Sequence, residues 1–99
     1  MKAEIYKHSQ WIPETDPEIL MFYFCKALER AEFNVLDFMQ HRFEPEGYTA
    51  IWLLAESHFA IHTFPEHRKS YIELSSCNID KHNKFLDLIK HEYEQNRTQ

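Results

Sequence analysis

The residue types best suited to chemistry gather around one dipeptide, Glu56-Ser57, which interrupts an apolar run. Three histidines follow within ten positions of the serine, and a cysteine follows twenty positions after it: His58, His62, His67 and Cys77. A serine hydroxyl beside histidines can supply a nucleophile, a base that titrates near neutral pH and stabilisation of an oxyanion. Short patterns also arise by chance, so a turn serine followed by surface histidines is the competing interpretation.

The seven histidines raise a second chemistry, a zinc site. His58 and His62 are four positions apart, which would place two ligands on one face of a helix. Their segment has the alternating pattern of a strand, however, and no cluster of cysteines or carboxylates completes a ligand set. We therefore expect no metal.

Length and composition favour one small domain, residues 1–99. Hydrophobic residues make up 43% of the chain, enough for a core, but so short a chain leaves much surface exposed, and association of copies is expected. The formal charge of -5 argues against binding to a nucleic-acid backbone. The one glycine, Gly47, excludes glycine-rich phosphate loops.

Hydropathy and cysteine usage favour a reduced cytoplasmic protein. No apolar run approaches the roughly 18 residues of a membrane helix, and the first ten residues lack the apolar core of a signal peptide. No membrane partner is therefore expected. Cys25 and Cys77 have neither CxxC spacing nor a disulfide framework. Cys25, within an aromatic-rich helical segment, is expected to be a small buried hydrophobe.

Two segments carry helical patterns. Residues 16–31 begin with a capping Thr15 or Asp16, and Pro17 stands at the first helical position. Their apolar face contains Leu20, Phe24, Ala27, Leu28 and Ala31. Residues 80–93 predict a second helix, whose apolar face contains Phe85, Leu88, Ile89 and Tyr93.

The remaining apolar segments predict an antiparallel sheet. A short strand at 3–6 precedes a polar loop, and further strands are expected at 34–43, 48–55 and 70–76. Residues 57–64 continue the alternation after the interruption at Glu56-Ser57, and the element order is written β-α-β-β-β-α. Such elements favour an α+β two-layer sandwich, with two helices covering one face of the sheet. The other face also carries apolar residues, so a dimer is expected.

The pattern between residues 33 and 78 is longer than a catalytic triplet. It runs through His41-Arg42-Phe43, a turn, an apolar strand, Glu56-Ser57-His58, Ile61-His62-Thr63-Phe64-Pro65-Glu66 and Cys77. These segments resemble the prokaryotic S-adenosylmethionine decarboxylases, whose hallmark is an HRF segment, a block of the form ESH-x-x-IHT-aromatic-PE and a downstream Cys. The flanking helices resemble that family more loosely.

The resemblance implies a proenzyme that cleaves itself into a β chain, residues 1–56, and an α chain, residues 57–99. The Ser57 hydroxyl attacks the Glu56 carbonyl, and the acyl group shifts from nitrogen to oxygen. Abstraction of the Ser57 Cα proton then eliminates the Glu56 carboxylate. Hydrolysis of the dehydroalanine releases ammonia and leaves a pyruvoyl group, the implied cofactor, which forms a Schiff base with the substrate amine and acts as the electron sink.

Further roles follow from the resemblance alone. His62 is the base of the elimination, Thr49 assists processing, and Cys77 protonates the substrate carbon after carbon dioxide leaves. Phe43 stacks on the adenine of S-adenosylmethionine, and Glu66 binds the ribose hydroxyls. The implied enzyme is a homodimer that supplies aminopropyl groups for spermidine synthesis.

Several positions depart from the family pattern. Phe64 stands where Trp is usual, Asn78 follows Cys77 in place of Gly, and the first strand lacks the usual Gly and His. These departures leave open a related pyruvoyl decarboxylase of ornithine or arginine. A non-catalytic relative that binds or regulates a partner without cleaving itself is a third hypothesis.

Strand alternation adds a condition on the proposed chemistry. It places Ser57 with Phe59 and Ile61, on the face opposite His62. For His62 to reach Ser57, we expect a bend or bulge at the cleavage point. A regular strand through residues 55–62 would contradict that expectation.

Overall fold

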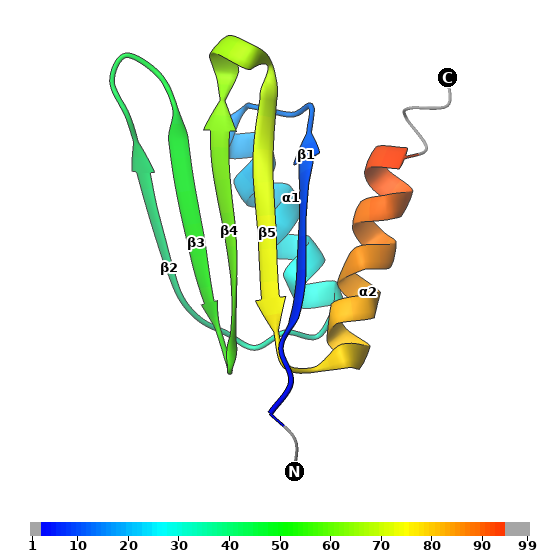
Figure 1. The fold of residues 1–99 in the computed structure, drawn as a ribbon. Coiled ribbons are helices and arrows are strands. Elements are labelled where there is room, and N and C mark those ends of the chain that lie inside the picture. The colour runs from blue at the N-terminus through cyan, green and yellow to red at the C-terminus, as the bar shows by residue number, and fades with distance from the viewer. Residues whose placement is uncertain (1–2, 95–99) are drawn as a thin grey trace.

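The computed structural model describes residues 3–94, which form one antiparallel sheet and a helical layer (Figure 1). The sheet order is β1-β5-β4-β3-β2, and every neighbouring pair is antiparallel. The elements are β1 (Tyr6–Ile12), α1 (Pro17–Arg30), β2 (Val35–Arg42), β3 (Tyr48–Leu54), β4 (Ser57–Phe64), a 3-10 turn (Pro65–His67), β5 (Lys69–Ser76), α2 (Ile79–Ile89) and a π-helical turn (Lys90–Glu94). The predicted α+β two-layer sandwich is confirmed.

The sheet has one strand more than the predicted order contains. The chain reverses at Ala55-Glu56, and β3 pairs with β4 from Leu54↔Ser57 to Thr49↔His62. Glu56-Ser57 therefore does not interrupt one continuing strand, because it lies where a hairpin turn delivers the chain into a new strand. The observed order is β-α-β-β-β-β-α.

The first strand also lies later than the predicted 3–6. It pairs with β5 along its whole length, from Tyr6↔Ser76 to Ile12↔Ser70. Most of this segment is polar and was expected to be a loop. Its partner strand is far along the chain, so local composition could not indicate the pairing, and the tertiary contact overrides it.

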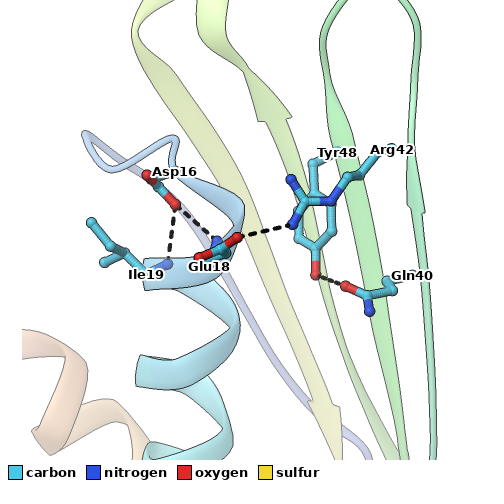
Figure 2. A network of polar contacts seen from close by, with 6 residues as sticks. All are labelled: Asp16, Glu18, Ile19, Gln40, Arg42 and Tyr48. Atoms are coloured by element: carbon cyan, nitrogen blue, oxygen red, sulfur yellow. Dashed lines mark hydrogen bonds and ion pairs between the residues drawn. The ribbon is translucent and has the colours of Figure 1, made fainter.

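Helix α1 starts beside β2 and β3, as Figure 2 shows. An Asp16 carboxylate oxygen caps the helix by accepting the backbone N–H of Glu18 at 2.9 Å. The Glu18 carboxylate lies 3.9 Å from the Arg42 guanidinium of β2, and the Tyr48 hydroxyl donates to Gln40 Oε1 at 2.6 Å. Both charges of the ion pair are solvent-exposed, so this contact contributes about 0–1 kcal/mol, and apolar packing decides where α1 lies.

One face of the sheet, the covered face, packs against the helices, with α1 running behind the strands in Figure 1. The rings of Phe24, Phe59 and Phe85 join α1, β4 and α2, with centroids 4.8 and 5.1 Å apart for successive pairs. Such ring pairs add about 0.5–1.5 kcal/mol each beyond their burial. The predicted apolar face of α1 is buried throughout: Leu20, Phe24, Ala27, Leu28 and Ala31.

One expectation for α1 is wrong. Cys25 is exposed, although it was expected to be a buried hydrophobe. It follows the buried Phe24 directly, and one helical step rotates a side chain by about 100°, which carries Cys25 off the buried face.

The other face of the sheet, the open face, has no helix over it among residues 3–94. Four large apolar side chains on it are between 42% and 70% exposed: Trp11, Met39, Ile51 and Leu53. Within the same described residues, no helix is long and apolar enough to span a membrane. An exposed apolar face on a small domain indicates a surface for association.

Candidate active site

The turn between β3 and β4 holds Glu56 in an unfavourable backbone conformation. Its φ is +60°, in the left-handed region. For a residue with a β-carbon this conformation costs about 1–2 kcal/mol, and such residues concentrate at functional sites. The bond predicted to break, Glu56-Ser57, thus directly follows a strained residue.

Cys77 reaches this turn from a distant part of the sequence. Strand β5 ends at Ser76, at the same end of the sheet as the β3–β4 turn (Figure 1). Cys77 Sγ lies 3.1 Å from the Glu56 carbonyl oxygen and 3.6 Å from Glu56 Oε2. The thiol donates a hydrogen bond to the carbonyl that Ser57 would attack. We call Glu56, Ser57 and Cys77 the junction.

Ser57 begins a regular strand. The pairing of β4 with β3 and with β5 keeps one register from residues 57 and 58 onward, without the predicted bulge. The expected bend is present at the cleavage point as the turn at Ala55-Glu56, while β4 itself contains no bulge. The bend does not bring Ser57 to the face that carries His62. Cross-strand partners share a face, so Ser57, paired with the buried Leu54, lies on the covered face.

A line of polar side chains crosses the open face at the other end of β4. His41, Thr49, His62 and Tyr71 are successive cross-strand partners on β2, β3, β4 and β5. We call these four residues the histidine row. Thr49 Oγ1 and His62 Nδ1 share a hydrogen bond at 3.1 Å, and both residues are half-buried. The structure thus brings together the predicted base and the predicted processing threonine.

Within one chain, the junction and the histidine row lie apart. His62 is five positions beyond Ser57 on β4, so a rise of about 3.3 Å per residue separates their α-carbons by roughly 16 Å. The two residues also occupy opposite faces of the sheet. A single chain therefore does not bring His62 to Ser57.

The two residues predicted to bind substrate are both exposed, near the end of the sheet where β2 and β4 finish. Phe43 is 49% exposed, and its ring lies edge-on to His41 with centroids 4.5 Å apart. Glu66 is exposed in the 3-10 turn after β4. Phe43 and Pro65 line one hollow of about 370 Å³, together with Thr63, whose buried Oγ1 has no hydrogen-bond partner among the described residues.

Sequence reasoning missed one buried polar pair beside the junction. His82 of α2 is 4% exposed, and its Nδ1 lies 3.0 Å from the Oγ of Ser76, the residue before Cys77. A signal was present, because His82 lies three and seven positions before Phe85 and Ile89, on the face predicted to be buried. Among residues 3–94, no group of three or more His, Cys, Asp or Glu side chains could hold a metal ion.

Comparison with known proteins places this geometry in a family. The sequence profile of S-adenosylmethionine decarboxylase matches residues 3–99, nearly the whole chain. The chain belongs to the S-adenosylmethionine decarboxylase family. The junction and the histidine row both fall within the match.

Curated relatives in this family share part of their length with the chain. The S-adenosylmethionine decarboxylase proenzyme of Prochlorococcus marinus (strain MIT 9313) is 45% identical over 51 residues, covering 52% of this chain and 41% of the relative. That of Shouchella clausii (strain KSM-K16) is 37% identical over 54 residues, covering 54% of this chain and 42% of the relative. The chain thus spans about two-fifths of the length of these relatives.

A solved structure has the same architecture. The crystal structure of the adenosylmethionine decarboxylase from Aquifex aeolicus superposes with a TM-score of 0.73 and 23% sequence identity, covering 91% of this chain and 79% of that one. At this identity the likeness shows the fold, which is that of an S-adenosylmethionine decarboxylase.

Proposed function

We propose that this chain is a proenzyme that cleaves itself at Glu56-Ser57 and then decarboxylates S-adenosylmethionine, supplying aminopropyl groups for spermidine synthesis. The observation that carries the proposal is the junction, where a strained Glu56 precedes Ser57 and the Cys77 thiol donates to its carbonyl. The products are a β chain, residues 1–56, and an α chain, residues 57–99. Family membership and relatives named as proenzymes support this function.

Self-cleavage begins when the Ser57 hydroxyl attacks the Glu56 carbonyl carbon. A C–O bond forms, the C–N bond breaks, and the nitrogen takes the hydroxyl proton. The Cys77 thiol stabilises the negative charge that develops on the carbonyl oxygen. A base then removes the Ser57 Cα proton and the Glu56 carboxylate leaves, after which water replaces the nitrogen and releases ammonia.

His62 is the proposed base, with Thr49 holding its ring. In the tautomer that the proposal requires, Nδ1–H donates to Thr49 Oγ1 across the 3.1 Å contact, which orients the imidazole and leaves Nε2 to take the proton. Because roughly 16 Å of strand separates His62 from Ser57 in one chain, we infer that each junction receives His62 from a second copy. The active species is then a homodimer.

The open face supports such a dimer. Its exposed apolar side chains, Trp11, Met39, Ile51 and Leu53, need a partner to leave water. A two-fold axis parallel to the sheet, crossing over β4 near Ala60 between residues 57 and 62, would pack two open faces together. The His62 of one chain would then approach the Ser57 backbone of the other from the open side, opposite the Ser57 side chain. Each site would then contain residues of both chains.

The pyruvoyl group at residue 57 would supply the electron sink for decarboxylation. Ser57 suits that modification because it opens β4, and cleavage before it leaves the pairing of β4 intact. Cys77 lies beside the same position and would return a proton to the substrate carbon. The exposed Phe43 ring and Glu66 carboxylate would hold the adenine and ribose hydroxyls.

Two exposed, unpaired cysteines favour a reduced, cytoplasmic setting.

Intact mass and a denaturing gel of the purified chain test the cleavage. We expect two species. The fragment of residues 57–99 should be blocked to Edman sequencing and lighter, by the mass of ammonia, than the same peptide with an N-terminal serine. Ser57→Ala should remain one chain and release no carbon dioxide from S-adenosylmethionine. Ser9→Ala, an exposed serine of β1, is the matched control and should cleave normally.

A single full-length species after prolonged incubation would overturn the processing step and favour a non-processing relative that binds or regulates a partner. For the substrate, carbon dioxide release from S-adenosylmethionine, ornithine and arginine is measured side by side. We expect release from S-adenosylmethionine alone. Faster release from ornithine or arginine would replace the proposed substrate while leaving the self-cleavage intact.

A further inference from the structure

Cys77 stands in a short connection that is fixed on both sides. Before it, Ser76 is buried at the end of β5, with its hydroxyl 3.0 Å from His82 Nδ1. After it, the Asn78 side chain accepts the backbone N–H of Lys81 at 3.0 Å, and the Asn78 carbonyl accepts that of His82 at 3.0 Å. The first turn of α2 therefore holds the residues on either side of the thiol.

His82 has no part in the proposed chemistry, yet it is a buried titratable group one residue away from it. It lies against the Tyr6 ring, with centroids 5.9 Å apart, and its side chain is closed off from solvent. Burial lowers the pKa of His82 below its usual value, and the nearby His8 lowers it further. The ring is therefore neutral near pH 7, and its Nδ1 and the Ser76 hydroxyl satisfy one another.

We propose that His82 is a positioning residue for the proposed reaction, acting through Ser76 to hold the Cys77 thiol against the Glu56 carbonyl. The contacts form one continuous path: His82 to Ser76 by hydrogen bond, Ser76 to Cys77 by the peptide bond, and Cys77 to Glu56 by the thiol. A displacement of about 1 Å at a reacting group can cost two orders of magnitude in rate. Loss of the buried pair should therefore release the thiol from the junction.

The proposal rests on the proposed function for its effect on cleavage, but the contact is measurable without any activity. The probe is alkylation of Cys77 by iodoacetamide in a Cys25→Ser, Ser57→Ala background, where Cys77 is the one thiol and the chain cannot cleave. A thiol that donates to a carbonyl is protected from forming the reactive thiolate. We expect His82→Leu and Ser76→Ala each to raise the alkylation rate about five- to tenfold, since both free the thiol.

Three comparisons separate positioning from general destabilisation. His82→Asn keeps a hydrogen-bonding atom close to the place of Nδ1 and should restore slow alkylation. The double variant with His82→Leu and Ser76→Ala should react no faster than either single variant, because both act on one path. Ser70→Ala removes an equally buried serine at the other end of β5, bonded to the Glu14 carbonyl, and should leave Cys77 unchanged.

Cleavage of the Ser57 chain gives the functional readout. His82→Leu and Ser76→Ala should slow it by similar factors of about ten or more, and His82→Asn should recover most of the rate. The proposal is overturned if folded Ser76→Ala leaves the alkylation rate unchanged, or if Ser70→Ala has effects as large as those of Ser76→Ala. Both results can be obtained even if His82→Leu fails to fold. If the parent chain cleaves slowly but the variants still alter the alkylation rate of Cys77, the result counts against the proposed function alone and the positioning role of His82 stands.

Discussion

The junction and the histidine row hold their polar groups by different means. At the junction, a tight turn forces Glu56 into the left-handed region, and a thiol from the end of another strand contacts its carbonyl. In the histidine row, regular strand register aligns His41, Thr49, His62 and Tyr71 on the open face, and a hydrogen bond joins Thr49 to His62. The junction has a strained residue and a hydrogen-bond donor, while the histidine row holds the proposed base, His62. Neither region alone would be sufficient for the proposed elimination step.

The strained residue and the proposed base are therefore separated by most of the length of β4. A turn can store strain because its neighbours on both strands are fixed by pairing. The proposed base, His62, lies on the open face and could act on a partner that packs against that face. Substitutions in either region test whether the separation is bridged between chains, and how much each region contributes.

Mixing two inactive variants should give the largest effect. Ser57→Ala lacks the nucleophile, and His62→Ala lacks the base, so neither should cleave alone. In a co-expressed mixture with distinguishable tags, the chain carrying His62→Ala should be cut, because its junction meets the intact His62 of the other chain. Intact mass identifies which chain is cut. The control mixes His62→Ala with a chain that carries both Ser57→Ala and His62→Ala, and it should give no cleavage.

No cleavage in that mixture, or cleavage of His62→Ala by itself, would contradict the exchange of residues between chains. The first result would indicate that His62 acts within its own chain after a rearrangement of β4. The second would indicate that another group removes the proton.

Removing the thiol from the junction should have the next largest effect. Cys77→Ala deletes the hydrogen bond to the Glu56 carbonyl and should slow self-cleavage by about 100-fold, as loss of an oxyanion donor does. Cys77→Ser keeps a donor and should retain more of the rate. Cys25→Ala removes the other exposed thiol and should cleave at the parent rate. Time courses on denaturing gels measure all three, and equal rates for Cys77→Ala and Cys25→Ala would exclude a role for the contact.

A charge on the open face should weaken the dimer. Leu53→Glu places a carboxylate among apolar side chains, and burying it costs several kcal/mol, so the dissociation constant should rise at least about tenfold. Phe22→Glu alters an apolar residue on the helical side that is even more exposed, and it should not affect association. Sedimentation velocity over a range of concentrations measures both. A dimer lost in Phe22→Glu and kept in Leu53→Glu would move the interface to the helices.

Relieving the strained turn should have a moderate effect. In a Ser57→Ala background, Glu56→Gly removes the penalty of positive φ and should stabilise the fold by about 1 kcal/mol, raising the melting temperature by about 4–8 °C. With Ser57 present, the relaxed junction should cleave more slowly. Arg68→Gly, at φ +56° after the 3-10 turn, is the control that should stabilise without slowing cleavage. Equal cleavage rates in both would show that the strain does not promote the reaction.

Acidification should produce the smallest effect, a loss of folding stability through His82, which lies beside the junction. The pKa of His82 is lower in the folded chain than its usual value near 6.5, so the unfolded chain binds the proton first. The stabilisation is complete above pH about 6.5 and is lost as pH falls through the folded pKa. Urea unfolding of the Ser57→Ala chain at several pH values measures it. His82→Asn should flatten the decline, and an undiminished decline would assign it to other groups.

Patterns read along the chain predicted the helices and the inner strands well. Helix α1 was predictable because Asp16 and Pro17 mark its start and its apolar residues repeat at helical spacing. Strand β1 was not, because His8, Ser9 and Gln10 are polar and only pairing with β5 makes them a strand. Propensity is local, and the energy that decides an edge strand comes from its partner.

The site was predictable in its residue types but not in its geometry. Simple alternation correctly set Ser57 and His62 on opposite faces, and the expected bend at the cleavage point is the turn at Ala55-Glu56. That turn does not bring the two residues together. The contact between Cys77 and Glu56 depends on the β3–β4 turn and the end of β5 meeting at the same end of the sheet. The burial of His82 depends on where α2 packs. Both are properties of the assembled fold.

The strand order has a consequence for what cleavage leaves behind. Strands β4 and β5 lie between β1 and β3, so the proposed cleavage at Glu56-Ser57 would leave two strands of the second fragment between two strands of the first. The fragments are bound along two separate ladders, β1 with β5 and β3 with β4, and share one apolar core. Neither piece has a complete sheet without the other. The proposed cleavage would thus leave two fragments that still form one folding unit, held together by the sheet and the core without a covalent bond between them.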